Sequence, residues 1–122
     1  MRTTVESIPV ELELGQLVTR GTDLGGIYTR HIQLPAGTDM RPLLAGLPND
    51  HCQCPHWGQV LSGSITIAYE DGSQEVCRAG DVYYWPAGHV GWTVDGVAFL
   101  ELSRTDEITP VLEHIGRQLA PA

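Results

Sequence analysis

Between residues 56 and 102 the chain divides into short segments of strand length, and no helical period runs through them. The segments are 56–61, 64–69, 74–78, 82–85, 91–94 and 97–102, separated by the turns Ser62-Gly63, Glu70–Ser73, Ala79–Asp81, Pro86–Gly88 and Asp95-Gly96. Short strands at this spacing, joined by glycine-containing turns, are typical of an antiparallel sandwich or barrel. The pattern predicts an all-β fold without a parallel sheet.

The segments on either side complete this picture. Three further strands are expected upstream, over Val10–Leu14, Leu17–Arg20 and Ile27–Leu34. Residues 40–50 contain two prolines and are expected to form a long loop. We therefore expect a barrel over about residues 5–103, within a single domain that spans residues 1–122.

The C-terminal segment is the one part with a helical period. Ile108, Val111, Leu112, Ile115 and Leu119 recur at helical spacing and predict a helix over about residues 106–119. Thr109 can cap this helix and Pro110 suits its first turn. The apolar face of the helix should pack on the barrel.

Composition excludes several classes of function. The chain has 122 residues and a net charge of −8, and its seven cationic residues are all arginines, dispersed from Arg2 to Arg117. No basic stripe is present to bind nucleic acid, and without lysine a Schiff-base mechanism is excluded. No apolar run approaches the roughly 18 residues of a membrane span, and the N-terminal segment has acids and a proline where an export signal needs an apolar core. A cytoplasmic location is expected.

Four side chains that can bind metal or undergo redox chemistry fall within six residues, in the stretch His51-Cys-Gln-Cys-Pro-His56. In an extended segment Cys52, Cys54 and His56 share one face. Thiolate and imidazole are ligands of zinc, iron and copper rather than of magnesium or calcium. His89, beyond the Pro86–Gly88 turn, is the natural additional ligand. The alternative is that His56 is a hydrogen-bonded histidine of the barrel and that the cysteines are small buried apolar groups.

Two longer stretches resemble the paired motifs of the cupin superfamily. They are His56-Trp-Gly-Gln-Val-Leu-Ser-Gly63 and Gly80-Asp-Val-Tyr-Tyr-Trp-Pro-Ala-Gly88. The resemblance implies an antiparallel jelly-roll barrel, with a C-terminal helix as a common extension and a metal site at one mouth of the barrel. It also implies a homodimer, because small cupins commonly pair, and exposed edge strands with apolar residues such as Val10 and Leu14 favour the same state.

The ligand positions depart from the cupin pattern of three histidines and one glutamate. Counted back from Gly63, His56 stands at the glutamate position, and His51 or Cys52 stands at the second histidine. In the second motif Gly91 takes the histidine position, and His89 stands two residues earlier. The resemblance therefore implies the location of the site, while its ligands are drawn from His51, Cys52, Cys54, His56 and His89.

Three residues are candidates for proton transfer beside such a metal. Strand alternation turns either Tyr83 or Tyr84 inward, and Glu101 can face in or out of the barrel.

Three functions fit this sequence. The first is a metal-dependent enzyme acting on a small molecule, such as an oxygenase, isomerase or lyase. The second is a module that binds a small molecule without turnover, and the third is a thiol redox or metal sensor based on Cys52 and Cys54. The resemblance does not choose between them, because cupins include all such activities.

Overall fold

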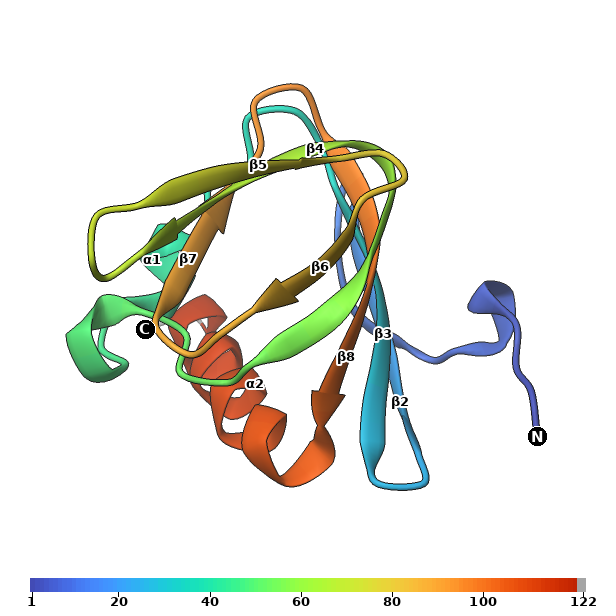
Figure 1. Cartoon of the computed structure of the whole chain (residues 1–122). Coiled ribbons are helices and arrows are strands. Elements are labelled where there is room, and N and C mark those ends of the chain that lie inside the picture. The colour runs from blue at the N-terminus through green and yellow to red at the C-terminus, as the bar shows by residue number, and fades with distance from the viewer. Residues whose placement is uncertain (121–122) are drawn as a thin grey trace.

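The structure is a computed structural model that describes residues 1–120. Its elements are η1 (Val5–Ser7), β1 (Val10–Leu14), β2 (Leu17–Leu24), β3 (Ile27–Leu34), α1 (Arg41–Leu44), η2 (Pro48–Asp50), β4 (His56–Tyr69), β5 (Gln74–Arg78), β6 (Val82–Trp85), β7 (His89–Trp92), β8 (Val97–Arg104) and α2 (Thr105–Leu119). The strands curve into a barrel, and α2 lies across one end of it (Figure 1). The expected antiparallel barrel with a C-terminal helix is confirmed.

Every pairing between these strands is antiparallel. The strand order is β1-β2-β3-β8-β4-β5, and β6 and β7 also pair with β4. The first part of β4 pairs with β6 and β8, and the last part pairs with β5 and β7. Because one strand contributes to both halves of the barrel, β4 fixes how they are placed relative to each other.

The expected turn at Ser62-Gly63 is wrong, since β4 continues without interruption through these residues. A register shift between Val60 and Ser62 bends the strand instead. Gly63 has a φ of 72°, and a Cβ there would collide with the backbone of Gly96. The glycine permits a bend within a strand and a close approach of two backbones. In the sequence, a glycine in either role cannot be distinguished from a glycine in a turn.

Alternation along β8 settles which of its residues face inward. Val97, Phe99, Glu101 and Ser103 are buried, while the residues between them are more exposed. The barrel core consists mainly of aliphatic and aromatic side chains from both halves, among them Ile32, Val60, Ile67, Trp85 and Phe99. Two polar side chains from β8, Glu101 and Ser103, therefore point into a predominantly apolar interior.

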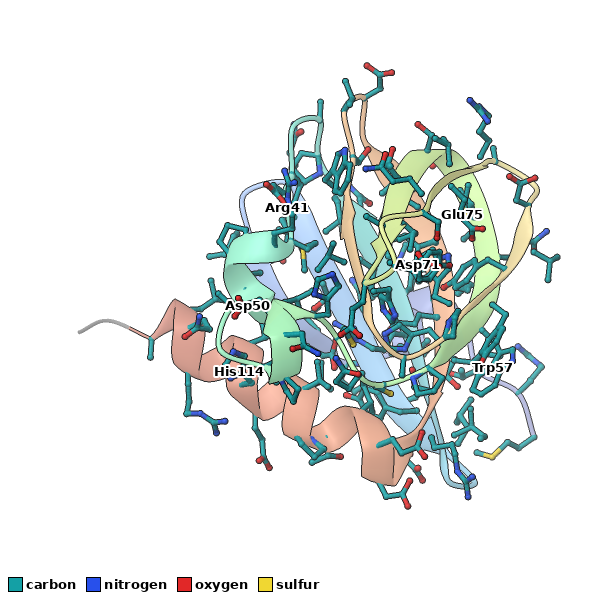
Figure 2. The ribbon with its side chains drawn as sticks, turned by 60° about the vertical axis from the view of Figure 1, so that its left-hand side comes forward. Arg41, Asp50, Trp57, Asp71, Glu75 and His114 are labelled. Carbon is teal, nitrogen blue, oxygen red and sulfur yellow. The ribbon has the colours of Figure 1, made fainter. Side chains whose placement is uncertain are left out.

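The segment from Met40 to Asp50 is not a plain loop, as the sequence suggested, because it contains the short helix α1 and the 3-10 turn η2. Its backbone is held against α2: the Ala45 carbonyl accepts hydrogen bonds from His114 Nε2 (2.7 Å) and from the Gln118 side chain (3.0 Å). Figure 2 shows His114 on the side of α2 that faces this segment, whereas Trp57 lies at the opposite side of the barrel.

Helix α2 begins four residues earlier than the expected Thr109 cap, at Thr105. The Thr105 N–H donates to the Gly26 carbonyl (3.0 Å) and its hydroxyl donates to Asp23, so β-hairpin groups satisfy the helix start. Pro110 consequently lies inside the helix, where it lacks the N–H that would pair with Asp106. Ile108 and Val111 face the barrel and are buried, as expected. Within residues 1–120, neither helix combines the length and the apolar character needed to cross a bilayer.

Candidate metal centre

Three donor side chains meet inside one end of the barrel. Ligand atoms of Cys52, His56 and His89 all lie within 4.8 Å of one another, and all three residues are buried. His56 begins β4 and His89 begins β7. Cys52 precedes β4 and is fixed on His89 by backbone pairing, with its N–H donating to the His89 carbonyl at 2.8 Å. This pairing explains how His89 reaches the cluster although it stands two residues before the cupin histidine position.

The position that usually carries the second-motif histidine has no room for one. Gly91 lies at that place, and a Cβ added to it would stand 3.0 Å from the Ile67 side chain and 3.4 Å from Ile65. The aliphatic core therefore fills the space of the usual ligand. The centre is displaced along β7 to His89.

Hydrogen bonds orient both imidazoles. His89 Nδ1 lies 2.7 Å from the Pro86 carbonyl, which can only accept, so Nδ1 carries the proton and Nε2 presents a lone pair. His56 Nδ1 lies 2.7 Å from the Ser103 hydroxyl, and its Nε2 lies 3.5 Å from Cys52 Sγ. Metal-bound histidines commonly have the second ring nitrogen held in this way.

Burial keeps the imidazoles neutral and the thiol protonated. Desolvation, with a smaller contribution from the neighbouring His56, lowers the pKa of His89 to about 4, and desolvation also lowers the pKa of His56. Desolvation raises the pKa of the Cys52 thiol to about 12. At neutral pH the site therefore offers two ready nitrogen donors and one sulfur donor that must lose a proton to bind a metal.

A buried carboxylate lies directly beside this cluster. Glu101 Oε1 is 3.6 Å from His56 Nε2, and Glu101 Oε2 accepts a hydrogen bond from Arg30 at 2.9 Å. Burial raises the pKa of Glu101, but attraction to His56 and Arg30 outweighs it, and the pKa falls below its usual value. Because His56 is neutral at pH 7, Arg30 is the cation that keeps Glu101 ionised. Arg30 also bonds Glu11 at 3.0 Å, and Glu11 accepts from the Tyr28 hydroxyl at 2.6 Å.

The cluster lies on the wall of a cavity of about 220 Å³. The cavity extends from the barrel interior to the inner face of α2. Cys52, His56, His89, Glu101 and Arg30 all line it. A small molecule in this cavity would reach the donor atoms directly.

Two predicted ligands lie outside this group. His51 is half-buried, and its Nδ1 is 2.5 Å from the Asn49 carbonyl. Cys54 is buried with its thiol donating to the Pro55 carbonyl at 3.5 Å, and desolvation raises its pKa to about 12. Cys52, Cys54 and His56 are all buried and alternate with less buried residues, as expected, but Cys54 does not join the cluster of ligand atoms.

The structure brings Glu101 to the site but neither tyrosine. Tyr83 faces inward and is buried, yet its ring stacks on Trp85 at 3.7 Å and its hydroxyl donates to the Leu100 carbonyl at 2.7 Å. Burial raises the pKa of Tyr83 far above its usual value. Tyr84 is 51% exposed and stacks on Trp57 outside the barrel. Neither tyrosine lines the cavity.

Three contributing residues were missed from sequence. They are Arg30, Glu11 and Ser103, which position Glu101 and His56. Arg30 lies directly opposite Glu101 in the β3–β8 pairing. A correct alignment of these two predicted strands would have placed the opposite charges together.

No protein-family sequence model matches this chain, and no curated protein matches it in sequence. Several solved structures, however, are similar to it in fold. The polyketide cyclase RemF from Streptomyces resistomycificus superposes with a TM-score of 0.63 at 16% identity, over 84% of this chain and 78% of that one. An RmlC-like cupin from Shewanella frigidimarina gives a TM-score of 0.60 at 17% identity, over 86% of this chain and 91% of the other.

A mutant of oxalate decarboxylase OxdC from Bacillus subtilis gives a TM-score of 0.58 at 19% identity, over 84% of this chain and 28% of the longer enzyme. These similarities show that the fold is the cupin barrel that the two sequence motifs indicated. At such identities they show the fold alone.

Proposed function

We propose that this cupin-fold chain is a metal-dependent enzyme for a small molecule, with a divalent transition metal held by Cys52, His56 and His89. The observation that carries the proposal is the orientation of the donors. The backbone carbonyl of Pro86 obliges His89 to present Nε2 as a lone pair, next to His56 Nε2 and Cys52 Sγ. All three donor atoms lie within 4.8 Å of one another in a predominantly apolar interior, so a single metal ion could bind all three.

The chemistry of the donors fits zinc, iron or copper. Two imidazole nitrogens and one thiolate are soft to intermediate ligands, whereas magnesium and calcium prefer oxygen. Three protein ligands are also the usual number at catalytic zinc sites, which keep a further position for water or substrate. A metal bound here would supply Lewis acidity, polarising a carbonyl or lowering the pKa of water.

The surrounding residues supply the proton chemistry. Glu101 is ionised and points at the same space as His56 Nε2, so its carboxylate can accept a proton from a molecule in the cavity. Arg30 holds the second carboxylate oxygen at 2.9 Å and fixes the direction of the first. The walls of the cavity are mostly apolar, which strengthens each of these interactions.

The two alternatives from sequence differ in how well they fit. A thiol redox sensor needs accessible thiolates of low pKa, whereas Cys52 and Cys54 are both buried with the pKa raised. A non-catalytic binding module would use the same cavity and the same metal. Turnover of a bound molecule separates that module from an enzyme.

The test is elemental analysis of protein purified without an affinity tag and loaded in turn with zinc, iron, copper and cobalt. We expect one equivalent of metal, with a thiolate-to-cobalt charge-transfer band in the cobalt form. Cys52→Ala should lose the band and most of the bound metal, and His56→Ala should lose both. Cys54→Ala is the matched control, because it removes another buried thiol two residues away, and it should keep both. Retention of metal and band by Cys52→Ala would refute the proposed ligand set.

A further inference from the structure

Polarity is distributed unevenly over the cavity wall. Charged and donor side chains form one connected series, in which Glu11 bonds Arg30, Arg30 bonds Glu101, and Glu101 lies beside the metal ligands. Apart from Thr19, the remaining wall is aliphatic, aromatic or glycine. A ligand that fits this wall has one polar end and an apolar body.

Helix α2 provides the outer part of the apolar wall. Ile108 and Val111 are buried under the helix, and Leu112 and Ile115 continue the same face towards its C-terminal end. Gly116 also lines the cavity, and a Cβ added there would meet no atom within 4 Å. Gly116 is exposed, so the cavity opens towards solvent at this end, where the far end of a ligand that begins at the metal ligands would lie.

The charges of the polar end favour a ligand without net charge. Arg30 is already paired with two carboxylates, Glu11 and Glu101, so these three side chains together carry one negative charge. A thiolate at Cys52 and a divalent metal would bring the sum to zero. An additional carboxylate would face two carboxylates, and an additional ammonium would lose its hydration in an apolar cavity.

The cavity volume sets the size of the ligand. A cavity of roughly 150 Å³ lined by apolar side chains holds benzene, with its six carbon atoms. By proportion, the cavity of about 220 Å³ accommodates about nine non-hydrogen atoms.

We propose that the cavity binds a neutral, largely apolar molecule of about nine non-hydrogen atoms with one carbonyl or hydroxyl oxygen. The oxygen lies among Cys52, His56, His89 and Glu101, and the carbon chain lies against α2. This assignment names the substrate class of the proposed function and rests on that function only for the metal that the oxygen meets.

Calorimetric titration of the full-length chain, metal-free and zinc-loaded, tests the class with four eight-carbon compounds: 2-octanone, 1-octanol, octanoate and octylamine. We expect 2-octanone and 1-octanol to bind at least tenfold more tightly than octanoate and octylamine. Gly116→Phe, which fills the open space beside α2, should weaken binding of 2-octanone at least tenfold. Glu113→Phe adds the same ring to an exposed position of α2 outside the cavity and should change it less than twofold.

The outcomes separate this inference from the proposed metal site. Tighter binding of octanoate or octylamine would overturn the neutral class. Zinc-loaded protein that holds one equivalent of metal but binds none of the four compounds would overturn the inference and leave the metal site intact. Binding of 2-octanone that Gly116→Phe abolishes, in a protein that takes up no metal, would support the inference and refute the metal site. Val111→Phe, a second substitution on the cavity wall, should reproduce the effect of Gly116→Phe if that variant folds poorly.

Discussion

The affinity of the site for zinc should rise tenfold for each pH unit between about pH 7 and about pH 9, because binding releases a single proton. That proton comes from the Cys52 thiol, whose pKa of about 12 keeps it protonated over this whole range. The imidazoles release none. The pKa of His89 is about 4 and that of His56 is also lowered, so both rings are already neutral.

Burial of the thiol has a calculable cost. Removing its proton at pH 7, five pH units below a pKa of about 12, requires roughly 7 kcal/mol at 1.36 kcal/mol per unit, and the rise from the ordinary value of 9.0 accounts for about 4 kcal/mol of this. Structural zinc sites bind with apparent free energies of about 10–16 kcal/mol, so the interaction with zinc can exceed this cost. Affinity should be correspondingly lower than for the same donors exposed to water.

The assay is competition with a chromophoric chelator at fixed ionic strength, with proton release measured independently by calorimetry in buffers of different ionisation enthalpy. Cys52→Ala should bind more weakly and with almost no dependence on pH. A slope of three just below pH 6.5, the ordinary pKa of histidine, would show that His89 as well as His56 is protonated in the metal-free site and refute the reasoning from burial. A slope of zero in the unmodified protein would show that the thiol is not a ligand.

Four further predictions concern stability and assembly. The folded-state pKa of His89 is lowered from 6.5 to about 4, so protonation favours the unfolded chain. The free energy of unfolding of the metal-free protein should therefore fall by roughly 3 kcal/mol through this residue as the pH falls from about 6.5 to about 4. Urea unfolding at several pH values should show this loss, and His89→Gln should lack it. Arg30→Met leaves buried carboxylates without their cation and should lower the free energy of unfolding by about 3–5 kcal/mol in the same assay. Adding Glu101→Gln to this variant should recover part of that loss. Gly58→Ala should lower the free energy of unfolding by about 3 kcal/mol, because its Cβ would collide with the Leu100 carbonyl and the Tyr83 ring. Gly116→Ala, in open space on a helix, should raise it by roughly 0.5–1 kcal/mol, and thermal unfolding measures both. The homodimer stays a prediction, supported by the apolar residues of the edge strand β1 that are about half exposed, and a monomer mass in light scattering across micromolar concentrations would contradict it.

Local sequence predicted the barrel because each strand carries its own signal. Val10–Leu14, Ile27–Leu34, Gln74–Arg78 and Val82–Trp85 have the bounds that alternation and the neighbouring turns indicated. Gly63 was misread because a glycine that permits a bulge and one that permits a turn have the same local signature. The start of α2 was predicted within one residue, but the cap was wrongly assigned to Thr109, because the first turn is satisfied by Gly26 and Asp23, about 80 residues earlier in the chain.

The site was partly accessible to the same reasoning. Spacing within the Cys52–His56 stretch and the motif around His89 located the cluster, since both follow from short segments of known direction. Arg30 could not be found in this way, because its contact with Glu101 joins residues 71 positions apart and depends on the register of two strands. Which of Tyr83 and Tyr84 faces inward depended equally on which side of β6 is covered, and that is decided by tertiary packing; neither lines the cavity.

The pairing of β3 with β8 determines when the protein can acquire its site during synthesis. Ile27 pairs with Arg104, so β3 has no partner on that edge until nearly the whole barrel sequence has left the ribosome. A nascent chain ending before β8 would expose the apolar face of β3 and an open strand edge, the two features that promote aggregation. Closure through such distant residues is also expected to be slow. Arg30 and Glu101 meet only at this final step, so a truncated product lacking β8 would have neither a closed barrel nor a buried carboxylate beside the donors.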